Sequence, residues 1–207
     1  MLVQDLSATK RKAFLTLVKK RVKPGSGSSL NFLSQRTWLH PVTNLSNILK
    51  QASFVVVGGV ATRLYMPERM TLDIDILIQA QDSYLIYQDL ERAHAQRKNN
   101  LSIPGSQWEL VDKTSLDVLE GDDPWVEDAL AHPNYAPDGL PIISLPYLIL
   151  MKLSVSRTQD LADVSRMLGL ARQTELTRIR EVIHEYLPTA QEDLESLILL
   201  GQLEVSK

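Results

Sequence analysis

The sequence predicts an α/β (α+β) fold, in which a small mixed sheet flanked by helices is followed by a helical C-terminal part. Two short apolar runs within residues 54–78 lie on either side of a glycine pair, and two more within 108–119 are joined by the turn-like segment Asp-Lys-Thr-Ser. From Ser144 onward, apolar residues recur at helical spacing. We therefore expect a basic N-terminal helix and linker (1–29), an α/β core (30–143) and a helical part (144–207).

The elements of the first half follow from apolar runs and the residues that interrupt them. The β-branched run before Gly58 is typical of a buried strand, and the residues after the glycines are typical of a helix. We expect helices at 6–22, 41–50, 60–65 and 83–96, and strands at 54–57 and 71–78.

The second half begins with a predicted hairpin and then turns helical. Its strands are expected at 108–111 and 116–119, and residues 120–141, rich in Asp, Pro and Gly, are expected to be irregular. Gly169 is expected to end a helix, because glycine is common just after helix C-termini. The expected helices cover 145–156, 158–171, 174–187 and 189–200.

The composition excludes several kinds of chemistry. The 207 residues are 44% hydrophobic, which is enough for a packed core. The absence of cysteine rules out disulfides, cysteine metal sites and thiol catalysis. No run approaches the roughly 20 apolar residues that span a bilayer, so we expect a cytoplasmic protein with no membrane partner.

Charge is unevenly distributed along the chain. Residues 1–23 carry seven Lys/Arg and one acid, a net charge of +6, so the remainder carries −9 of the overall −3. The Pro/Gly/Ser-rich segment 23–29 reads as a flexible linker, which would make the basic helix a loosely packed arm. This arm would suit nucleic-acid contact, since phosphate neutralisation dominates such binding; an ordinary solvated helix is the alternative.

Two aspartates interrupt the second apolar run. In a strand, Asp73 and Asp75 share one face, while Ile74, Ile76 and Ile78 share the other. Burying two neighbouring carboxylates is unfavourable unless cations balance them, and hard oxygen ligands at this spacing suit Mg²⁺ or Mn²⁺. The alternative is that both acids face solvent on an edge strand.

The glycine pair strengthens the metal interpretation. Gly58 and Gly59 stand between a predicted strand and a predicted helix, where a turn without side chains lets phosphate oxygens approach backbone N–H groups at the positive end of a helix. An ordinary tight turn is the alternative. The order strand, Gly-Gly, helix and acidic strand would place a phosphate cradle and a metal platform in one unit.

Residues 54–78 resemble the signature of the nucleotidyltransferase superfamily with the polymerase-beta-like fold. That signature is a hydrophobic residue, Gly-Gly or Gly-Ser, a spacer, and Asp-hydrophobic-Asp-hydrophobic; here thirteen residues separate Gly59 from Asp73. The segment Arg-Met-Thr-Leu-Asp-Ile-Asp also resembles the form found in a bacterial branch related to abortive-infection nucleotidyltransferase toxins. The resemblance implies that Arg69 and Thr71 lie near the nucleotide.

The resemblance also implies a third carboxylate on a later antiparallel strand. Asp117 fits, because it is the acid inside the apolar run Leu-Asp-Val-Leu of the predicted hairpin. Glu109, in the partner strand, is a competitor, and an exposed strand acid remains the alternative for Asp117.

A downstream helical signature of the same branch resembles LILMKLSVSRTQDLADVSRML. Lys152, Arg157, Asp160 and Asp163 match it in order. The resemblance implies that Lys152 contacts nucleotide phosphates and that Asp160 positions Lys152 or the substrate. A helix-surface set of salt bridges is the alternative, and it is equally favoured for Asp163. The resemblance covers roughly residues 50–168.

Other chemistries find no support in the sequence. The four histidines lack metal-ligand spacing, and neither a Gly-x-Ser-x-Gly elbow nor a Walker-type phosphate loop is present. We therefore expect a Mg²⁺- or Mn²⁺-dependent nucleotidyltransferase in which Asp73, Asp75 and Asp117 bind the metal and act in catalysis.

Its substrates would be a nucleoside triphosphate such as ATP and an acceptor hydroxyl of a tRNA, a protein or a small molecule. A toxin–antitoxin connection would follow from the branch that the sequence resembles. The alternative is a catalytically inactive member of the fold that acts as a binding module, antitoxin-like or RNA-contacting.

Overall fold

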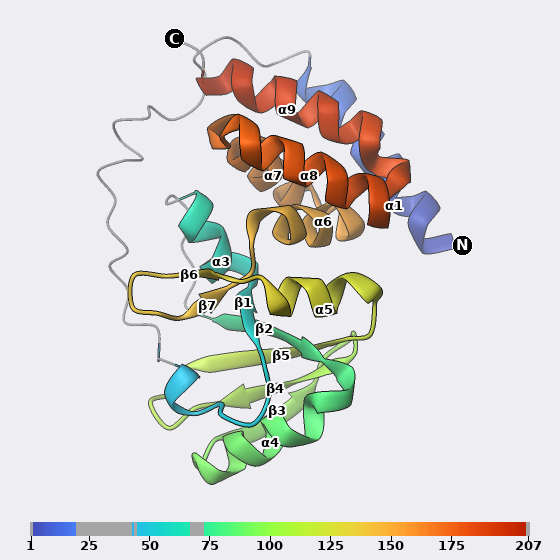
Figure 1. Cartoon of the computed structure of the whole chain (residues 1–207). Coiled ribbons are helices and arrows are strands. Elements are labelled where there is room, and N and C mark those ends of the chain that lie inside the picture. The colour runs from blue at the N-terminus through green and yellow to red at the C-terminus, as the bar shows by residue number, and fades with distance from the viewer. Residues whose placement is uncertain (1, 20–42, 44, 67–72, 206–207) are drawn as a thin grey trace. The chain divides into compact units, whose positions relative to one another are not determined.

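A computed structural model of the chain describes residues 2–19, 43, 45–66 and 73–205. These residues form two compact units (Figure 1). The sheet unit contains 43, 45–64 and 73–144, and the helical unit contains 2–19, 65–66 and 145–205. The N-terminal helix therefore belongs to the same unit as the C-terminal helices, whereas the sequence predicts it as a separate segment.

The sheet unit is built on a seven-stranded sheet of order β3-β4-β5-β2-β1-β7-β6. The β1–β7 and β2–β5 pairs are parallel and the others are antiparallel, which confirms the expected mixed sheet. The strands are β1 (Val55–Val57), β2 (Ile74–Gln79), β3 (Gln96–Asn100), β4 (Gly105–Glu109), β5 (Ser115–Gly121), β6 (Asn134–Tyr135) and β7 (Pro141–Ile142). Its helices are α3 (Gly58–Tyr65), α4 (Ser83–Arg92) and α5 (Pro124–Ala131), with 3-10 turns at Leu45–Asn47 and Ala80–Asp82.

The central strands owe their position to apolar side chains. All three valines of β1 are buried, and Ile74, Ile76 and Ile78 of β2 are buried as well. Strand β2 starts one residue after Asp73, so Asp73 precedes the strand that it was expected to belong to. Residues 71 and 72 of that expected strand lie outside the described ranges.

Helices α4 and α5 pack on opposite faces of the sheet (Figure 1). Tyr87 of α4 meets Trp108 of β4, with ring centroids 5.4 Å apart. On the other face, Val126 of α5 lies so close to Gly121 that a Cβ added there would be 2.7 Å from Val126 Cγ2. Because side chains alternate along strands, Asp75 and Asp117 lie on the face that α5 partly covers.

The helical unit confirms the expected helical C-terminal part. Its elements are α1 (Leu2–Val18), α6 (Leu145–Val155), α7 (Thr158–Leu170), α8 (Gln173–Tyr186) and α9 (Gln191–Val205), with a 3-10 turn at Pro188–Ala190. None of the helices in the described ranges is both long enough and apolar enough to cross a membrane.

Helix α1 is anchored into this unit, so the expectation of a loosely packed arm is wrong for its described residues. Arg11 is 1% exposed; its Nε donates to Asp193 Oδ2 at 2.7 Å and its Nη1 donates to the Leu153 carbonyl at 3.1 Å. Ser7 Oγ donates to the Ser154 carbonyl at 2.9 Å. Two side chains of α1 thus satisfy carbonyls in the last turn of α6 that have no partner within that helix.

Gly169 does not end its helix, since α7 continues to Leu170. It lies instead where α7 crosses α9: a Cβ added at Gly169 would be 2.4 Å from the Gly201 carbonyl oxygen. Likewise, a Cβ added at Gly201 would be 1.9 Å from the Ser165 carbonyl oxygen. The two glycines let the helix backbones approach closely, so Gly169 reflects tertiary packing rather than a local stop signal.

Three other expected elements differ in the structure. The segment 120–141 contains α5 and β6, and β7 follows it; α5 starts at Pro124, where proline is well tolerated. The helix expected at 83–96 ends at Arg92, and β3 follows it. Within the described part of 41–50 there is only a 3-10 turn, after which the Asp89 carboxylate accepts bonds from the Lys50 and Gln51 N–H groups.

Candidate active site

The parallel pairing of β2 and β5 brings two of the predicted acids together. Asp75 and Asp117 are direct register partners on these neighbouring strands, so their side chains lie on the same face. Asp73, exposed just before β2, is close enough for its charge to raise the pKa of Asp117. Asp75 and Asp117 thus lie together at one end of two adjacent strands, and Asp73 is near enough for its charge to act on Asp117.

Gly58 adjoins Asp75 directly. It stands at the junction of β1 and α3 with φ +61°, a conformation that favours glycine. A Cβ at this position would lie 1.9 Å from Asp75 Oδ2, so only glycine leaves room for the carboxylate. The first turn of α3 therefore starts beside an acid, in an orientation where helix N–H groups favour negatively charged groups.

Asp117 has a raised pKa. Burial is the largest cause; a hydrogen bond from Gln107 opposes the rise, and the nearby charge of Asp73 adds to it. In that bond, Gln107 Nε2 donates to Asp117 Oδ1 at 3.1 Å. A carboxylate pKa shifted by burial together with a neighbouring charge is common in functional sites.

Glu109, the competitor for the third carboxylate, has a different environment. It is a register partner of Ser115, two residues from Asp117 along β5, and its Oε1 accepts bonds from Lys113 at 2.9 Å and forms an ion pair with Lys98 at 3.3 Å. These two lysines lower the pKa of Glu109. The register therefore places Asp117, and not Glu109, opposite Asp75.

The donor set of this site suits a hard divalent cation. Its side chains are carboxylates, the ligands that Mg²⁺ and Mn²⁺ prefer, and Gly58, which has no Cβ, leaves room for the carboxylate of Asp75. In the described ranges, no group of three His, Cys, Asp or Glu residues is arranged closely enough to hold a metal by protein ligands alone.

The downstream signature forms a second cluster, in the helical unit. Lys152 Nζ donates to Asp160 Oδ1 at 3.1 Å and to Asp163 Oδ2 at 2.9 Å, and all three side chains are buried. Arg157 Nε donates to Asp160 Oδ2 at 2.6 Å. Asp163, for which two interpretations were equally favoured, is thus a direct partner of the lysine.

Burial acts on the pKa of Asp160 in the upward direction, but the bonds and charges of Arg157 and Lys152 outweigh it, and the pKa is lowered. Arg69 and Thr71, the other residues predicted to bind nucleotide, lie outside the described ranges.

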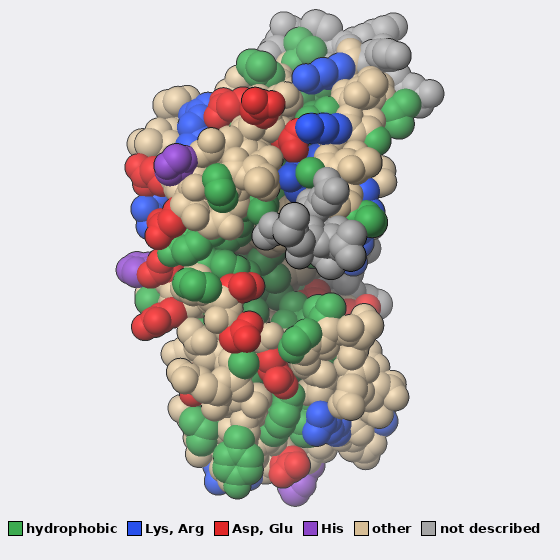
Figure 2. All heavy atoms as spheres, turned by 90° about the vertical axis from the view of Figure 1, so that its right-hand side faces the viewer, with side chains coloured by type: hydrophobic (Ala, Val, Ile, Leu, Met, Phe, Trp, Pro, Cys, Tyr) green, Lys and Arg blue, Asp and Glu red, His purple; other side chains and the backbone are tan. Residues whose placement is uncertain are grey.

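The basic residues of α1 do not all lie on an exposed surface. Lys10, Lys12 and Lys19 are exposed, whereas Arg11 is buried in its pairing with Asp193. On the face drawn in Figure 2, Lys and Arg side chains lie among Asp and Glu side chains rather than forming a continuous basic surface.

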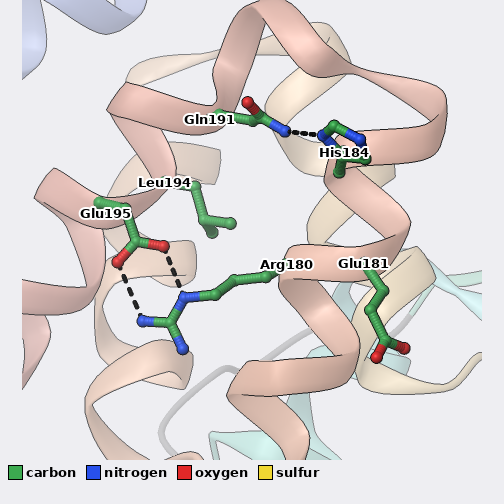
Figure 3. A pocket seen from close by; sticks show the side chains of 6 residues that line it. All are labelled: Arg180, Glu181, His184, Gln191, Leu194 and Glu195. Carbon is green, nitrogen blue, oxygen red and sulfur yellow. Dashed lines mark hydrogen bonds and ion pairs between the residues drawn. The ribbon is translucent and has the colours of Figure 1, made fainter.

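A pocket of about 430 Å³ lies between α8 and α9 (Figure 3). Arg180 and Glu195 pair across it, through bonds of 2.6 and 2.9 Å. Its lining residues are Arg180, Glu181, His184, Gln191, Leu194 and Glu195. None of the residues predicted from sequence lines it.

Gln107 was not among the site residues predicted from the sequence. The sequence could have indicated it only through the hairpin register, because the residue opposite Asp117 in the partner strand is Gln107. The apolar runs alone do not fix that register.

Comparison with known proteins shows similarity at the level of structure. No family model matches the sequence. No curated protein matches it either. Among solved structures, the chain is similar to the antibiotic-resistance factor ANT(2'')-Ia, with 16% identity over 73% of this chain and 82% of that chain and a TM-score of 0.38.

Two further solved structures are similar. The lincosamide antibiotic adenylyltransferase LnuA matches with 15% identity over 64% of this chain and 86% of that chain and a TM-score of 0.36. The Thermotoga maritima CCA-adding enzyme, complexed with tRNA, matches with 15% identity over 89% of this chain and 55% of that chain and a TM-score of 0.36. These structural neighbours are nucleotidyltransferase-fold proteins.

Proposed function

We propose that the chain is a metal-dependent nucleotidyltransferase that transfers a nucleoside monophosphate from a nucleoside triphosphate to an acceptor hydroxyl. The observation that carries the proposal is the register pairing of Asp75 with Asp117 beside Gly58. Two carboxylates on one sheet face, next to a helix start without a side chain, supply both a cation platform and an anion cradle.

Each residue of the site has a proposed role. Asp73, Asp75 and Asp117 would hold Mg²⁺ or Mn²⁺, and Gly58 and Gly59 would admit the phosphates to the backbone N–H groups of α3. When bound, the cation would supply charge stabilisation for the entering and leaving oxygens of a phosphoryl displacement. Asp117 would also accept the proton of the acceptor hydroxyl, whose oxygen bonds to the α-phosphorus as the bond from that phosphorus to pyrophosphate breaks.

Lys152 and Asp160 are proposed to act on the nucleotide as well, as are Arg69 and Thr71. The bonds to Asp160 and Asp163 account for two of the three N–H donors that a lysine ammonium carries. Its third donor is suited to a phosphate oxygen, and the two aspartates hold the side chain in one position.

The test is transfer of label from each α-labelled nucleoside triphosphate, in the presence of Mg²⁺ or Mn²⁺ and total cell extract. We expect a labelled product whose size class identifies the acceptor as a tRNA, a protein or a small molecule. The double variant Asp73→Asn/Asp75→Asn is expected to abolish labelling, because carboxamides are poor ligands for the cation. Labelling that persists in this variant would contradict the proposal.

Calorimetry separates this function from that of a binding module. Metal-dependent binding of a nucleoside triphosphate supports the enzyme. Salt-sensitive RNA binding without any nucleotide binding would instead favour a module that contacts RNA through the exposed lysines of α1.

A further inference from the structure

We propose that Gln107 is a positioning residue for Asp117, supported in turn by Asn99 of the edge strand β3; this inference rests on the proposed function. Gln107 and Asp117 are register partners in β4 and β5, and the Gln107 Nε2 to Asp117 Oδ1 distance is 3.1 Å. Neither Gln107 nor Asn99 belongs to the signatures that the sequence resembles.

The orientation of the Gln107 amide follows from the charge of its partner. An ionised carboxylate only accepts hydrogen bonds, so the amide must turn its NH₂ group toward Asp117 and its oxygen away from it. That oxygen accepts a bond from Asn99 Nδ2 at 3.4 Å. A row of three side chains therefore crosses three neighbouring strands and ends at Asp117, beside Asp75.

A register shift in β3 makes this row possible. Arg97 pairs with Trp108, but Asn99 pairs with Gln107, so one residue is skipped between them. Without the shift, Lys98 would stand opposite Gln107. With the shift, Lys98 instead forms an ion pair with Glu109 at 3.3 Å, and the Asn99 amide stands opposite Gln107. Bulges of this kind often redirect a side chain next to a functional site.

A neutral partner suits a metal-binding carboxylate. A glutamine fixes the rotation of the carboxylate without neutralising its charge, whereas a lysine at the same place would compete with a cation for it. In the helical unit, Asp160 has such a lysine partner, Lys152, which already balances its charge. Gln107 thus orients Asp117 while leaving the full negative charge for a metal ion.

The test is the affinity of the purified full-length chain for Mn²⁺ alone, measured by electron paramagnetic resonance. Gln107→Met keeps the side-chain length but removes the donor, and we expect it to weaken Mn²⁺ binding by about tenfold, the lower end of the effect of losing such a supporting bond. Asn99→Ala should weaken it by about threefold. Gln96→Met is the matched control: Gln96 is a glutamine of the neighbouring strand β3, opposite Glu109 rather than Asp117's partner, and the variant should leave the affinity unchanged.

The outcomes separate this inference from the proposed function. If Asp117→Asn abolishes Mn²⁺ binding but Gln107→Met binds like the wild type, the inference is overturned and the metal site stands. If Asp117→Asn also binds Mn²⁺ like the wild type, both are overturned. Should circular dichroism show that Gln107→Met is unfolded, Asn99→Ala decides, because its side chain is exposed on the edge strand; unchanged affinity in that variant overturns the inference.

Discussion

The acidic cluster around Asp160 and the one around Asp117 have opposite electrostatic environments. In the helical unit, Asp160 lies against Lys152 and Arg157, and its pKa is lowered although burial opposes that change. In the sheet unit, burial and the negative charge of Asp73 raise the pKa of Asp117, and the hydrogen bond from the neutral Gln107 only partly opposes the rise. The first cluster supplies its own cations, and the second is suited to one from outside.

The largest expected effect concerns the cluster of Lys152, Asp160 and Asp163, in which the lysine balances the charge of the aspartates. Lys152→Met would leave Asp160 and Asp163 buried without their shared cation, so we expect the free energy of unfolding to fall by about 3–5 kcal/mol. Urea denaturation measures this loss. Lys12→Met is the matched control, because Lys12 is exposed on α1 and should cost little. A variant as stable as the wild type, but inactive, would instead assign Lys152 wholly to the nucleotide.

The next effect concerns the space beside Asp75. Gly58→Ala adds a Cβ that would lie 1.9 Å from Asp75 Oδ2 at a residue with φ +61°, so we expect a loss of about 2–3 kcal/mol together with loss of nucleotidyl transfer. Gly139→Ala provides the comparison: its φ is +83°, but no atom lies within 4 Å of the added Cβ. It should cost about 1 kcal/mol and leave transfer intact. If the two variants lost equal stability and both kept transfer, Gly58 would be needed only for its backbone conformation and not for the space beside Asp75.

A smaller effect of opposite sign is expected at Asp117. Its folded-state pKa is raised, so its contribution to stability is present below the unfolded pKa and is lost as pH rises through the folded pKa. Asp117→Asn removes that loss, and we expect it to increase the free energy of unfolding at pH 7.5 by about 0.5–1 kcal/mol while abolishing transfer. The gain should vanish at low pH. A destabilised variant at pH 7.5 would mean that Asp117 is a structural acid.

The smallest effect concerns Arg157, which is 73% exposed although its partner Asp160 is buried. Arg157→Gln should lower the free energy of unfolding by about 0.5 kcal/mol at neutral pH, in the range of exposed ion pairs. Because the pKa of Asp160 is lowered in the fold, this contribution is present above the unfolded pKa and is lost as pH falls through the folded pKa. Denaturation curves of the two proteins should therefore converge in acid; a constant difference would point to lost packing instead.

The edge strand β3 and the region around α5 show where sequence patterns are insufficient. All five residues of β3 are polar and exposed, so no apolar run announced a strand. Helix α5 begins at a proline within an Asp-rich stretch that favoured a loop, and β7 is a two-residue strand defined by its parallel pairing with β1. These elements depend on neighbours that are distant in sequence.

The sequence by itself determined the alternation of isoleucines with Asp75 in β2, the glycines at the start of α3, the helices of the C-terminal part, and the hairpin of β4 and β5, although β4 covers Gly105–Glu109 rather than the expected 108–111. Each of these is encoded in a short window, because side-chain periodicity and backbone preference are local properties. Only the tertiary structure decided that Asp117 stands opposite Asp75, that Gln107 bonds to it, and that Asp163 shares Lys152 with Asp160. Strand register and burial arise from pairings between distant segments, which no local pattern specifies.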